Sequence, residues 1–248
     1  MNLVKTEKEI AIMRQGGKIL AEIMEGLKQE VRPGVKTKDL DKLAQELVFK
    51  FQVKPGFLNY QGFPNVLCTS VNETIVHEIP SDYILKEGDI LSLDMGIIYK
   101  GYYADMAATV PVGQISREAK FLIRAVKKAL NISIKKVKPG NTLGDLGNTI
   151  QRYLEKRGLE VVKELCGHGI GKELHESPEV LNYGQRKKGL KLQKGMVICI
   201  EPMAALGRAK IEKAADGFGF KTIDDSLSAH FEHMVAVSDK GAVVLTEL

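Results

Sequence analysis

Hydrophobic positions recur at helical spacing in the first fifty or so residues of the chain. Thr6 and Glu9 form a capping-box pattern, and apolar residues follow at intervals of three and four until Pro33 and Gly34. A second run with the same spacing begins directly afterwards, with Thr37 as its predicted cap. The pattern therefore predicts two consecutive helices joined by a short turn.

The same plan returns in the second half of the chain. Ser116 begins a second long helical pattern that stops at Pro139 and Gly140, and Thr142 caps another helix after it. The strand-rich segments repeat as well, because three residues of the first half recur at the same spacing in the second, namely Cys68, His77 and Pro80 with Cys166, His175 and Pro178. We interpret the chain as two similar halves.

Helices that come in pairs, and do not alternate with strands, favour an α+β fold in which helix pairs cover antiparallel sheets. A spacing this long between repeated features is not typical of a solenoid. We predict one domain, residues 1–248, with pseudo-symmetric halves of approximately 1–113 and 114–248.

Acidic residues interrupt the apolar strands at matching places. Asp94 ends one apolar run, and Asp105 lies on the strand that returns after a predicted turn. A hairpin centred between Tyr99 and Lys100 would place the two carboxylates directly opposite each other on one face. Carboxylates that close repel unless a proton or a cation lies between them.

The second half carries equivalent acids and a histidine with little steric cover. Glu201 ends the apolar run 196–200, and Glu232 precedes the apolar run 234–237. His168 lies in the glycine-rich segment 166–171. A salt bridge or a strand-end position would explain any one of these acids, but all four at symmetric points favour a shared site.

Four carboxylates and one imidazole form an oxygen-rich ligand set. Such a set suits two divalent ions, Co²⁺, Mn²⁺, Fe²⁺ or Zn²⁺, and does not suit a closed structural zinc site. Two ions about 3.5–4 Å apart can ionise a water molecule and polarise a carbonyl group. The sequence therefore predicts hydrolysis of an amide or an ester.

Composition and charge indicate in which cell compartment the protein works and which kinds of partner it binds. Hydrophobic residues make up 44% and charged residues 27% of the chain, which is ordinary for a globular protein. Early acidic residues and the lack of a long apolar run argue against a signal peptide and a membrane span. We expect a cytoplasmic protein with reduced Cys68, Cys166 and Cys199. The net charge of +5 is compatible with a weak ribosome contact and gives no indication of specific DNA binding.

With these residues in place, the chain resembles the type I methionine aminopeptidases along essentially its whole length. The segments 71–73, 166–171, 200–202 and 226–233 are similar to that family's motifs. The order of five residues also matches the family's metal ligands: Asp94, Asp105, His168, Glu201 and Glu232. The resemblance implies the pita-bread (creatinase/aminopeptidase) fold and a two-metal aminopeptidase that acts as a monomer.

The resemblance also implies a role for each ligand. Asp94 and Glu201 would bind opposite metal ions, Asp105 and Glu232 would bridge them, and His168 would bind the same ion as Glu201. Glu201 would in addition carry the proton of the attacking water.

The implied substrate is the N-terminus of a nascent polypeptide, from which the initiator methionine is removed when the second residue is small. His77 and His175 would contact the scissile amide and stabilise the tetrahedral intermediate. The methionine side chain would occupy a pocket formed by Tyr60, Phe63, Cys68, His77, Leu174 and Phe218.

Five positions differ from the common bacterial pattern of that family. Phe57 stands where a cysteine is frequent, and Gly96 stands where a hydroxyl group is frequent. Phe63 replaces a tyrosine, Leu174 a phenylalanine and Phe218 a tryptophan. These differences concern the shape of the pocket and the metal preference, not the type of reaction.

Two other functions remain open at this point. A hydrolase of the same fold that acts on Xaa-Pro peptides or on creatine usually carries an extra N-terminal domain, for which the chain has no room before Thr6. A non-catalytic binding protein of this fold has typically lost metal ligands, whereas this chain has all five.

Overall fold

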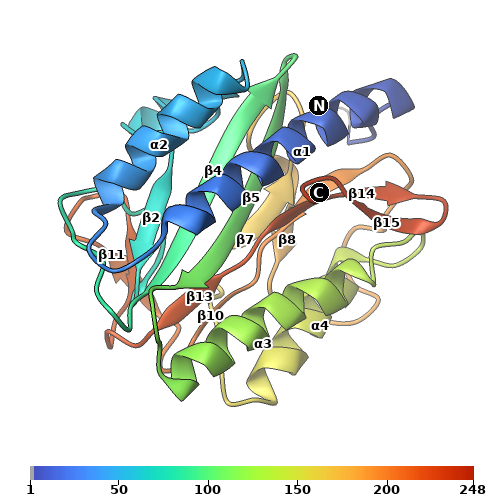
Figure 1. Cartoon of the computed structure of the whole chain (residues 1–248). Coiled ribbons are helices and arrows are strands. Elements are labelled where there is room, and N and C mark those ends of the chain that lie inside the picture. Colours follow the sequence, from blue (N-terminus) through green and yellow to red (C-terminus); the bar gives the residue numbers. More distant parts are fainter. Residues whose placement is uncertain (1–2) are drawn as a thin grey trace.

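The computed structural model describes residues 3–248, so Met1 and Asn2, the first residues of the predicted domain, lie outside the described residues. Two pairs of helices alternate with groups of short strands along the chain (Figure 1). The helices are α1 (Glu7–Glu30), α2 (Thr37–Lys50), α3 (Arg117–Ile134) and α4 (Leu143–Glu155). None of the helices in residues 3–248 is long and apolar enough to cross a membrane.

Three of the four predicted helix caps are confirmed. Thr6 forms a reciprocal capping box with Glu9, and Thr142 forms one with Asp145. The Ser116 hydroxyl accepts the amide of the third helical residue of α3.

The prediction that Thr37 caps α2 is wrong. Thr37 is the first helical residue, and the preceding Lys36 occupies the cap position without a side-chain bond. The Thr37 hydroxyl instead donates to the Ser81 carbonyl and accepts the Ser81 amide, at 3.1 and 2.8 Å. It therefore ties α2 to the loop before β4, a long-range contact that the local pattern does not reveal.

The strands form antiparallel sheets, as predicted from the paired helices. In one sheet, β4 pairs with β1, β2 and β5, and a second sheet has the order β15-β14-β9-β7-β8. Two smaller sheets have the orders β13-β10-β6 and β11-β12-β3. The strand bounds are β1 (Lys54–Pro55), β2 (Cys68–Val71), β3 (Thr74–Val76), β4 (Ile90–Tyr99), β5 (Tyr102–Pro111), β6 (Glu160–Val161), β7 (Cys166–Gly169), β8 (Glu176–Leu181), β9 (Val197–Ile200), β10 (Met203–Ala205), β11 (Ile211–Lys213), β12 (Phe220–Thr222), β13 (Ser228–His230), β14 (His233–Ser238) and β15 (Gly241–Val244).

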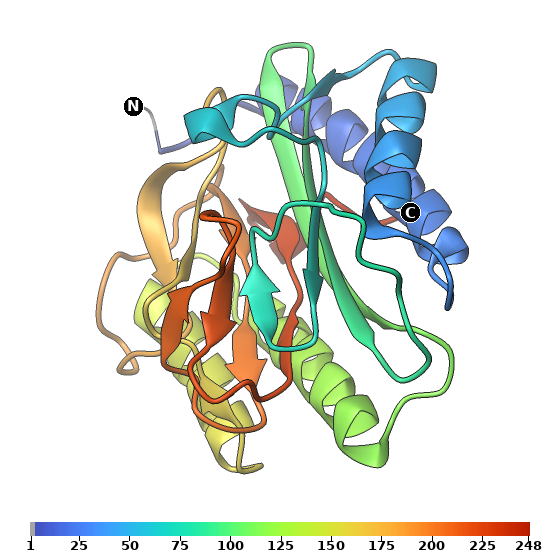
Figure 2. The same cartoon turned by 90° about the vertical axis from the view of Figure 1, so that its left-hand side faces the viewer.

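The helix pairs lie against one side of these sheets. Helix α1 packs on β4 and β5, and α3 packs on β9, β10 and β13 (Figure 1). In the turned view of Figure 2, α1 and α2 lie to one side of the long β4–β5 hairpin, and the short strands lie to the other. The buried face of each helix is the apolar stripe that the sequence pattern indicates.

The two halves share their hydrophobic cores. Met95 and Met106 of the first half belong to the same buried cluster as Cys199 and Met234 of the second. A second cluster joins Ile90 with the apolar face of α3. That the chain forms one domain stays a prediction, and shared cores of this kind are what such a domain would have.

The β4–β5 hairpin has a different register from the one predicted. Tyr99 pairs with Tyr102, so Lys100 and Gly101 form a two-residue turn with φ angles of 48° and 81°. Positive φ at both turn residues matches the twist of the flanking strands. Asp94 therefore pairs with Ala107, and Asp105 lies diagonally from Asp94 on the same face instead of directly opposite it.

Candidate metal centre and substrate cavity

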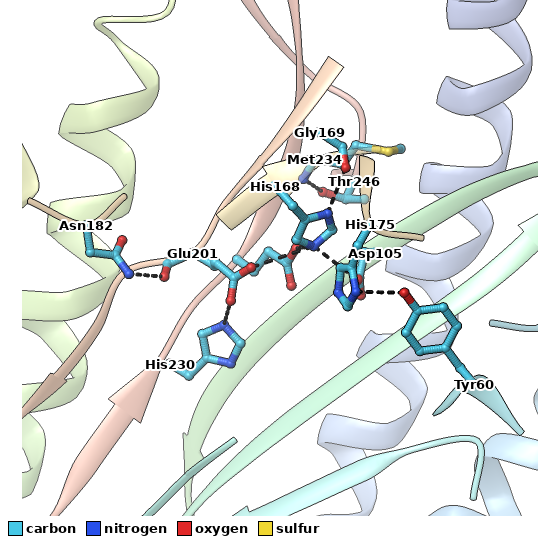
Figure 3. Close-up of polar contacts among 11 residues, drawn as sticks. Tyr60, Asp105, His168, Gly169, His175, Asn182, Glu201, His230, Met234 and Thr246 are labelled. Atoms are coloured by element: carbon cyan, nitrogen blue, oxygen red, sulfur yellow. Dashed lines mark hydrogen bonds and ion pairs between the residues drawn. The ribbon is translucent and has the colours of Figure 1, made fainter. Parts of the chain in front are cut away.

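The five predicted ligand residues converge from five separate strands or strand ends. Asp94 lies on β4, Asp105 on β5 and His168 on β7, whereas Glu201 directly follows β9 and Glu232 directly precedes β14. Asp94, Asp105, His168 and Glu232 are buried, and the Glu201 side chain is 12% exposed. Figure 3 shows Glu201, Asp105 and His168 pointing toward one another from different elements.

Strand pairing explains why the acids of the two halves meet. Ile200 and His233 are the last pair of the β9–β14 ladder, so Glu201 and Glu232 emerge side by side just beyond it. The Glu232 amide donates to the Ala107 carbonyl of β5 at 2.9 Å. This bond joins the two halves at the point where their carboxylates gather.

His168 presents one ring nitrogen to the acids. Its Nδ1 lies 2.9 Å from the Gly169 carbonyl, which can only accept, so Nδ1 carries the hydrogen. Nε2 then has a free lone pair. It lies 3.6 Å from an oxygen of Glu201, 3.8 Å from Asp105 and 3.9 Å from Glu232.

Several carboxylate oxygens at this centre lack a hydrogen-bond partner. Within the described part of the chain, Asp94 Oδ1, Asp105 Oδ1 and Glu232 Oε1 are buried and unpaired. Ligand atoms of these three residues lie within 4.8 Å of one another. A buried carboxylate without a partner is unfavourable, and a cation among them would satisfy these oxygens. The residues present therefore fit a metal ion.

The pKa values describe how poorly this cluster tolerates charge without a cation. Burial raises the pKa of Asp94 to about 7 and that of Glu201 to about 8, and it raises the pKa of Asp105 and Glu232 well above the usual range. Burial lowers the pKa of His168 to about 3, so its imidazole is neutral at pH 7. A neutral imidazole is the form that binds metals.

The ligand atoms fall into two overlapping groups. Glu232 lies close to both Asp94 and Asp105, and it also lies close to His168 and Cys199. Asp105 approaches His168 as well. Glu232 therefore belongs to both groups, and Asp105 lies next to a member of each.

Cys199 is a neighbour of the acids that the sequence reasoning did not assign to the site. It is fully buried, and burial, with Glu232 beside it, raises the pKa of its thiol well above the usual range. The thiol donates a hydrogen bond to Glu232, and its sulfur lies among the ligand atoms of His168 and Glu232. Its position two residues before Glu201 on one strand was the available signal, because alternate residues share a face.

The predicted substrate residues line one cavity of about 510 Å³ beside the acids. They are Tyr60, Phe63, Cys68, His77, Leu174, His175 and Phe218. The rings of Phe63 and Phe218 meet edge to face with centroids 5.6 Å apart. Cys68 and Leu174 are almost fully buried, so the cavity is lined by apolar groups on several sides.

His77 and His175 line both this cavity and a second one of about 450 Å³. Both residues are exposed to solvent. The Tyr60 hydroxyl lies 2.9 Å from Nδ1 of His175 (Figure 3). The His175 ring also packs edge to face on that of His168, with centroids 4.3 Å apart.

Further residues beside the acids or along the cavity were not among the predicted site residues. His230 places Nε2 3.3 Å from an oxygen of Glu201 (Figure 3). The cavity is also lined by Gln61, Lys213, Gly217 and Phe220, and by Phe57, which the family resemblance had already connected with the shape of the pocket. The sequence gives no local signal for Lys213 and Phe220, because the fold brings them in from β11 and β12.

Residues 11–239 match the model of metallopeptidase family M24. A methionine aminopeptidase of Clostridium perfringens is 44% identical over 246 residues, which is 99% of this chain and 99% of the relative. Methionine aminopeptidase 1 of Bacillus subtilis is 41% identical over 248 residues and the full length of both chains. The crystal structure of methionine aminopeptidase from Thermotoga maritima superimposes with a TM-score of 0.98 at 39% identity, with all of both chains covered.

Proposed function

Because this chain belongs to metallopeptidase family M24, we propose that its buried acids and His168 bind two divalent metal ions for peptide hydrolysis. The chain is a metallo-aminopeptidase that removes the initiator methionine, as its full-length relatives are named for doing. The fold is the pita-bread fold of that family.

The observation that carries the two-metal proposal is the set of buried, unpaired carboxylate oxygens beside the free nitrogen of His168. Asp94 is suited to one ion, and His168 with Glu201 to the other. Asp105 and Glu232 are suited to bridge them. Co²⁺, Mn²⁺, Fe²⁺ and Zn²⁺ all accept this donor set.

When bound, such ions acidify water and polarise a substrate carbonyl. Glu201 is placed to accept the proton of the attacking water, since one oxygen faces His168 and the other lies beside His230. A carboxylate that has taken up this proton can pass it on to the departing amine.

His77 and His175 are placed to donate hydrogen bonds to the reacting amide. When Tyr60 donates to Nδ1 of His175, the hydrogen of that ring is on Nε2, where it can be donated to a substrate oxygen.

The apolar cavity suits the methionine side chain. The rings of Tyr60, Phe63 and Phe218, with the sulfur of Cys68, offer soft, polarizable contacts to a thioether. His77 and His175 line both cavities, and we propose that the second residue of the substrate, which would lie beyond them, must be small.

We also propose the cellular setting. The partners are the N-termini of nascent polypeptides, met in the cytoplasm by a monomeric single-domain enzyme. Its mild positive charge allows at most a weak ribosome contact.

The decisive experiment is cleavage of Met-Ala-Ser and of an Ala-Pro peptide by protein supplied with each divalent metal, with mass detection of the products. We expect release of free methionine from the first peptide only. Cleavage of the Ala-Pro peptide alone would overturn the methionine assignment. Failure to bind Mn²⁺ or Co²⁺ after anaerobic purification would favour a non-catalytic binding protein.

A further inference from the structure

Gly96 lies on the face of β4 that carries the acids. It is two residues beyond Asp94, and its partner across the β4–β5 ladder is Asp105. Because alternate strand residues share a face, a side chain at position 96 would point toward the metal centre. The sequence leaves this place without a side chain.

The ring of Phe57 occupies that place. A Cβ atom added to Gly96 would lie 2.7 Å from Cε1 and 3.1 Å from Cδ1 of Phe57. Real Cβ atoms essentially never approach another heavy atom to 2.7 Å, so one of the two would have to move. Phe57 and Gly96, two of the positions that differ from the common bacterial pattern, therefore compensate for each other sterically.

The backbone holds Phe57 against Gly96. Strand β1 pairs with β4 up to Pro55 and Ile97, and the Gly56 amide continues the contact by donating to the Gly96 carbonyl at 2.8 Å. The Phe57 carbonyl accepts the Tyr60 amide at 2.9 Å. Gly56 is itself so close that an added Cβ would lie 2.7 Å from the Gly96 carbonyl carbon. Residues 56 and 57 therefore cannot move closer to β4.

Phe57 is buried, and its ring is also part of the wall of the 510 Å³ cavity that is proposed to hold the methionine side chain. Because the backbone at Gly56 and Gly96 fixes this ring, the ring limits the size of the side chain that the cavity can hold. We propose that Phe57, accommodated by the bare backbone of Gly96, sets the size of the first residue that the enzyme accepts. This inference rests on the proposed function and adds the residue pair that determines its selectivity.

The first test compares peptides that begin with methionine and with ethionine, which has one methylene more. Phe57→Ala should raise the ratio of kcat/KM for ethionine to that for methionine by about tenfold or more, since one methylene in an apolar pocket is typically worth that much. Both peptides are measured on one sample, so the ratio does not depend on how much of the variant is folded. The control is Phe49→Ala, at an 86% exposed ring on α2.

The second test asks whether the two residues act as a unit. Gly96→Ala should push the ring into the cavity and shift selectivity from methionine toward the shorter norvaline. In the Phe57→Ala variant, Gly96→Ala should change the ratio of kcat/KM for norvaline to that for methionine only a little, because no ring is left to displace.

The outcomes separate this inference from the proposed function. A wild-type enzyme that releases no methionine would end the proposed function. If the wild type does release methionine, the inference alone can still fail. It would be overturned if Phe57→Ala and Phe49→Ala had the same ratio of kcat/KM for ethionine to that for methionine. The steric coupling would be overturned if Gly96→Ala changed the ratio of norvaline to methionine cleavage equally with and without the Phe57 ring.

Discussion

Buried carboxylates are the residues on which the chemistry depends. Asp94, Asp105 and Glu232 each bury an oxygen that no hydrogen bond satisfies among residues 3–248. Their places were predictable from the sequence, because an acid that ends or interrupts an apolar strand is out of keeping with its neighbours. What each carboxylate does there is a proposal that substitution can test.

Glu201→Gln should lower kcat by at least about 100-fold, because the amide can neither carry the proton of the attacking water nor supply a ligand charge. The measurement is kcat for Met-Ala-Ser at saturating metal. Glu46→Gln, at an exposed carboxylate of α2, is the control and should leave kcat unchanged. A Glu201→Gln enzyme with near wild-type kcat would refute the proposed role.

Glu78 should make stability depend on pH. Burial raises its pKa from 4.5 to about 7, although it accepts the Val71 amide at 2.9 Å. The folded protein thus binds more protons than the unfolded chain between pH 4.5 and 7, so this residue reduces stability as pH rises through that window.

In Glu78→Gln this contribution disappears, and its amide oxygen can still accept the Val71 hydrogen. The free energy of unfolding of the variant minus that of the wild type should therefore rise between pH 4.5 and 7, by on the order of 2 kcal/mol. Denaturant unfolding at a series of pH values measures it, with Glu46→Gln as the control. A difference that stays flat across the window would contradict the prediction.

Some residues of the site could not be found by reading the chain. Cys199 had a signal in strand alternation. The family resemblance indicated that Phe57 and Gly96 affect the pocket, but nothing in the sequence indicated that these two residues are in contact. Steric complementarity between distant positions leaves no pattern within either local segment.

At the scale of elements, the β4–β5 hairpin decides how the first two acids are arranged. The sequence predicted the hairpin but misplaced its centre, because the alternation of side chains is the same for any shift of two residues. The turn conformation selects the actual register. The diagonal arrangement separates the carboxylates along the strands while keeping them on one face.

Gly101→Ala tests that turn. Gly101 has φ of 81°, and an added Cβ would meet nothing within 4 Å, so only the backbone conformation opposes the substitution. We expect a loss of roughly 1 kcal/mol in the free energy of unfolding. The matched control is Gly26→Ala within α1, which should leave stability unchanged or raise it. A neutral Gly101→Ala would show that the turn tolerates side chains.

At the scale of the whole molecule, the prediction of two similar halves rests on the repeated helices and strand motifs. The contacts between the cores of the two halves could not be predicted from the sequence. Cys199 and Met234 pack with Met95 and Met106, and such contacts depend on how the halves meet in three dimensions. The repeat shows that the halves are similar but not how they join.

Metal binding should stabilise the entire fold, because the ligands come from both halves and gather only in the folded chain. Added Mn²⁺ at about 100 times its dissociation constant should contribute about 2.7 kcal/mol. For a chain of this size that corresponds to a rise in Tm of roughly 5–10 °C over the chelator-treated protein.

Asp94→Asn should show a smaller rise in Tm, whereas Glu46→Gln should show the full one. Thermal unfolding by circular dichroism measures all three proteins with and without the ion. An equal rise in Asp94→Asn and the wild type would place the ion elsewhere.

The interleaved cores also bear on what happens if the chain is cut. The loop between β5 and α3 separates Asp94 and Asp105 from the other three ligands, so neither fragment has a complete centre. Each fragment would also expose apolar surface that the other normally covers. A chain cut in this loop should thus give two fragments that are inactive separately. Peptide hydrolysis should return only when the two fragments associate.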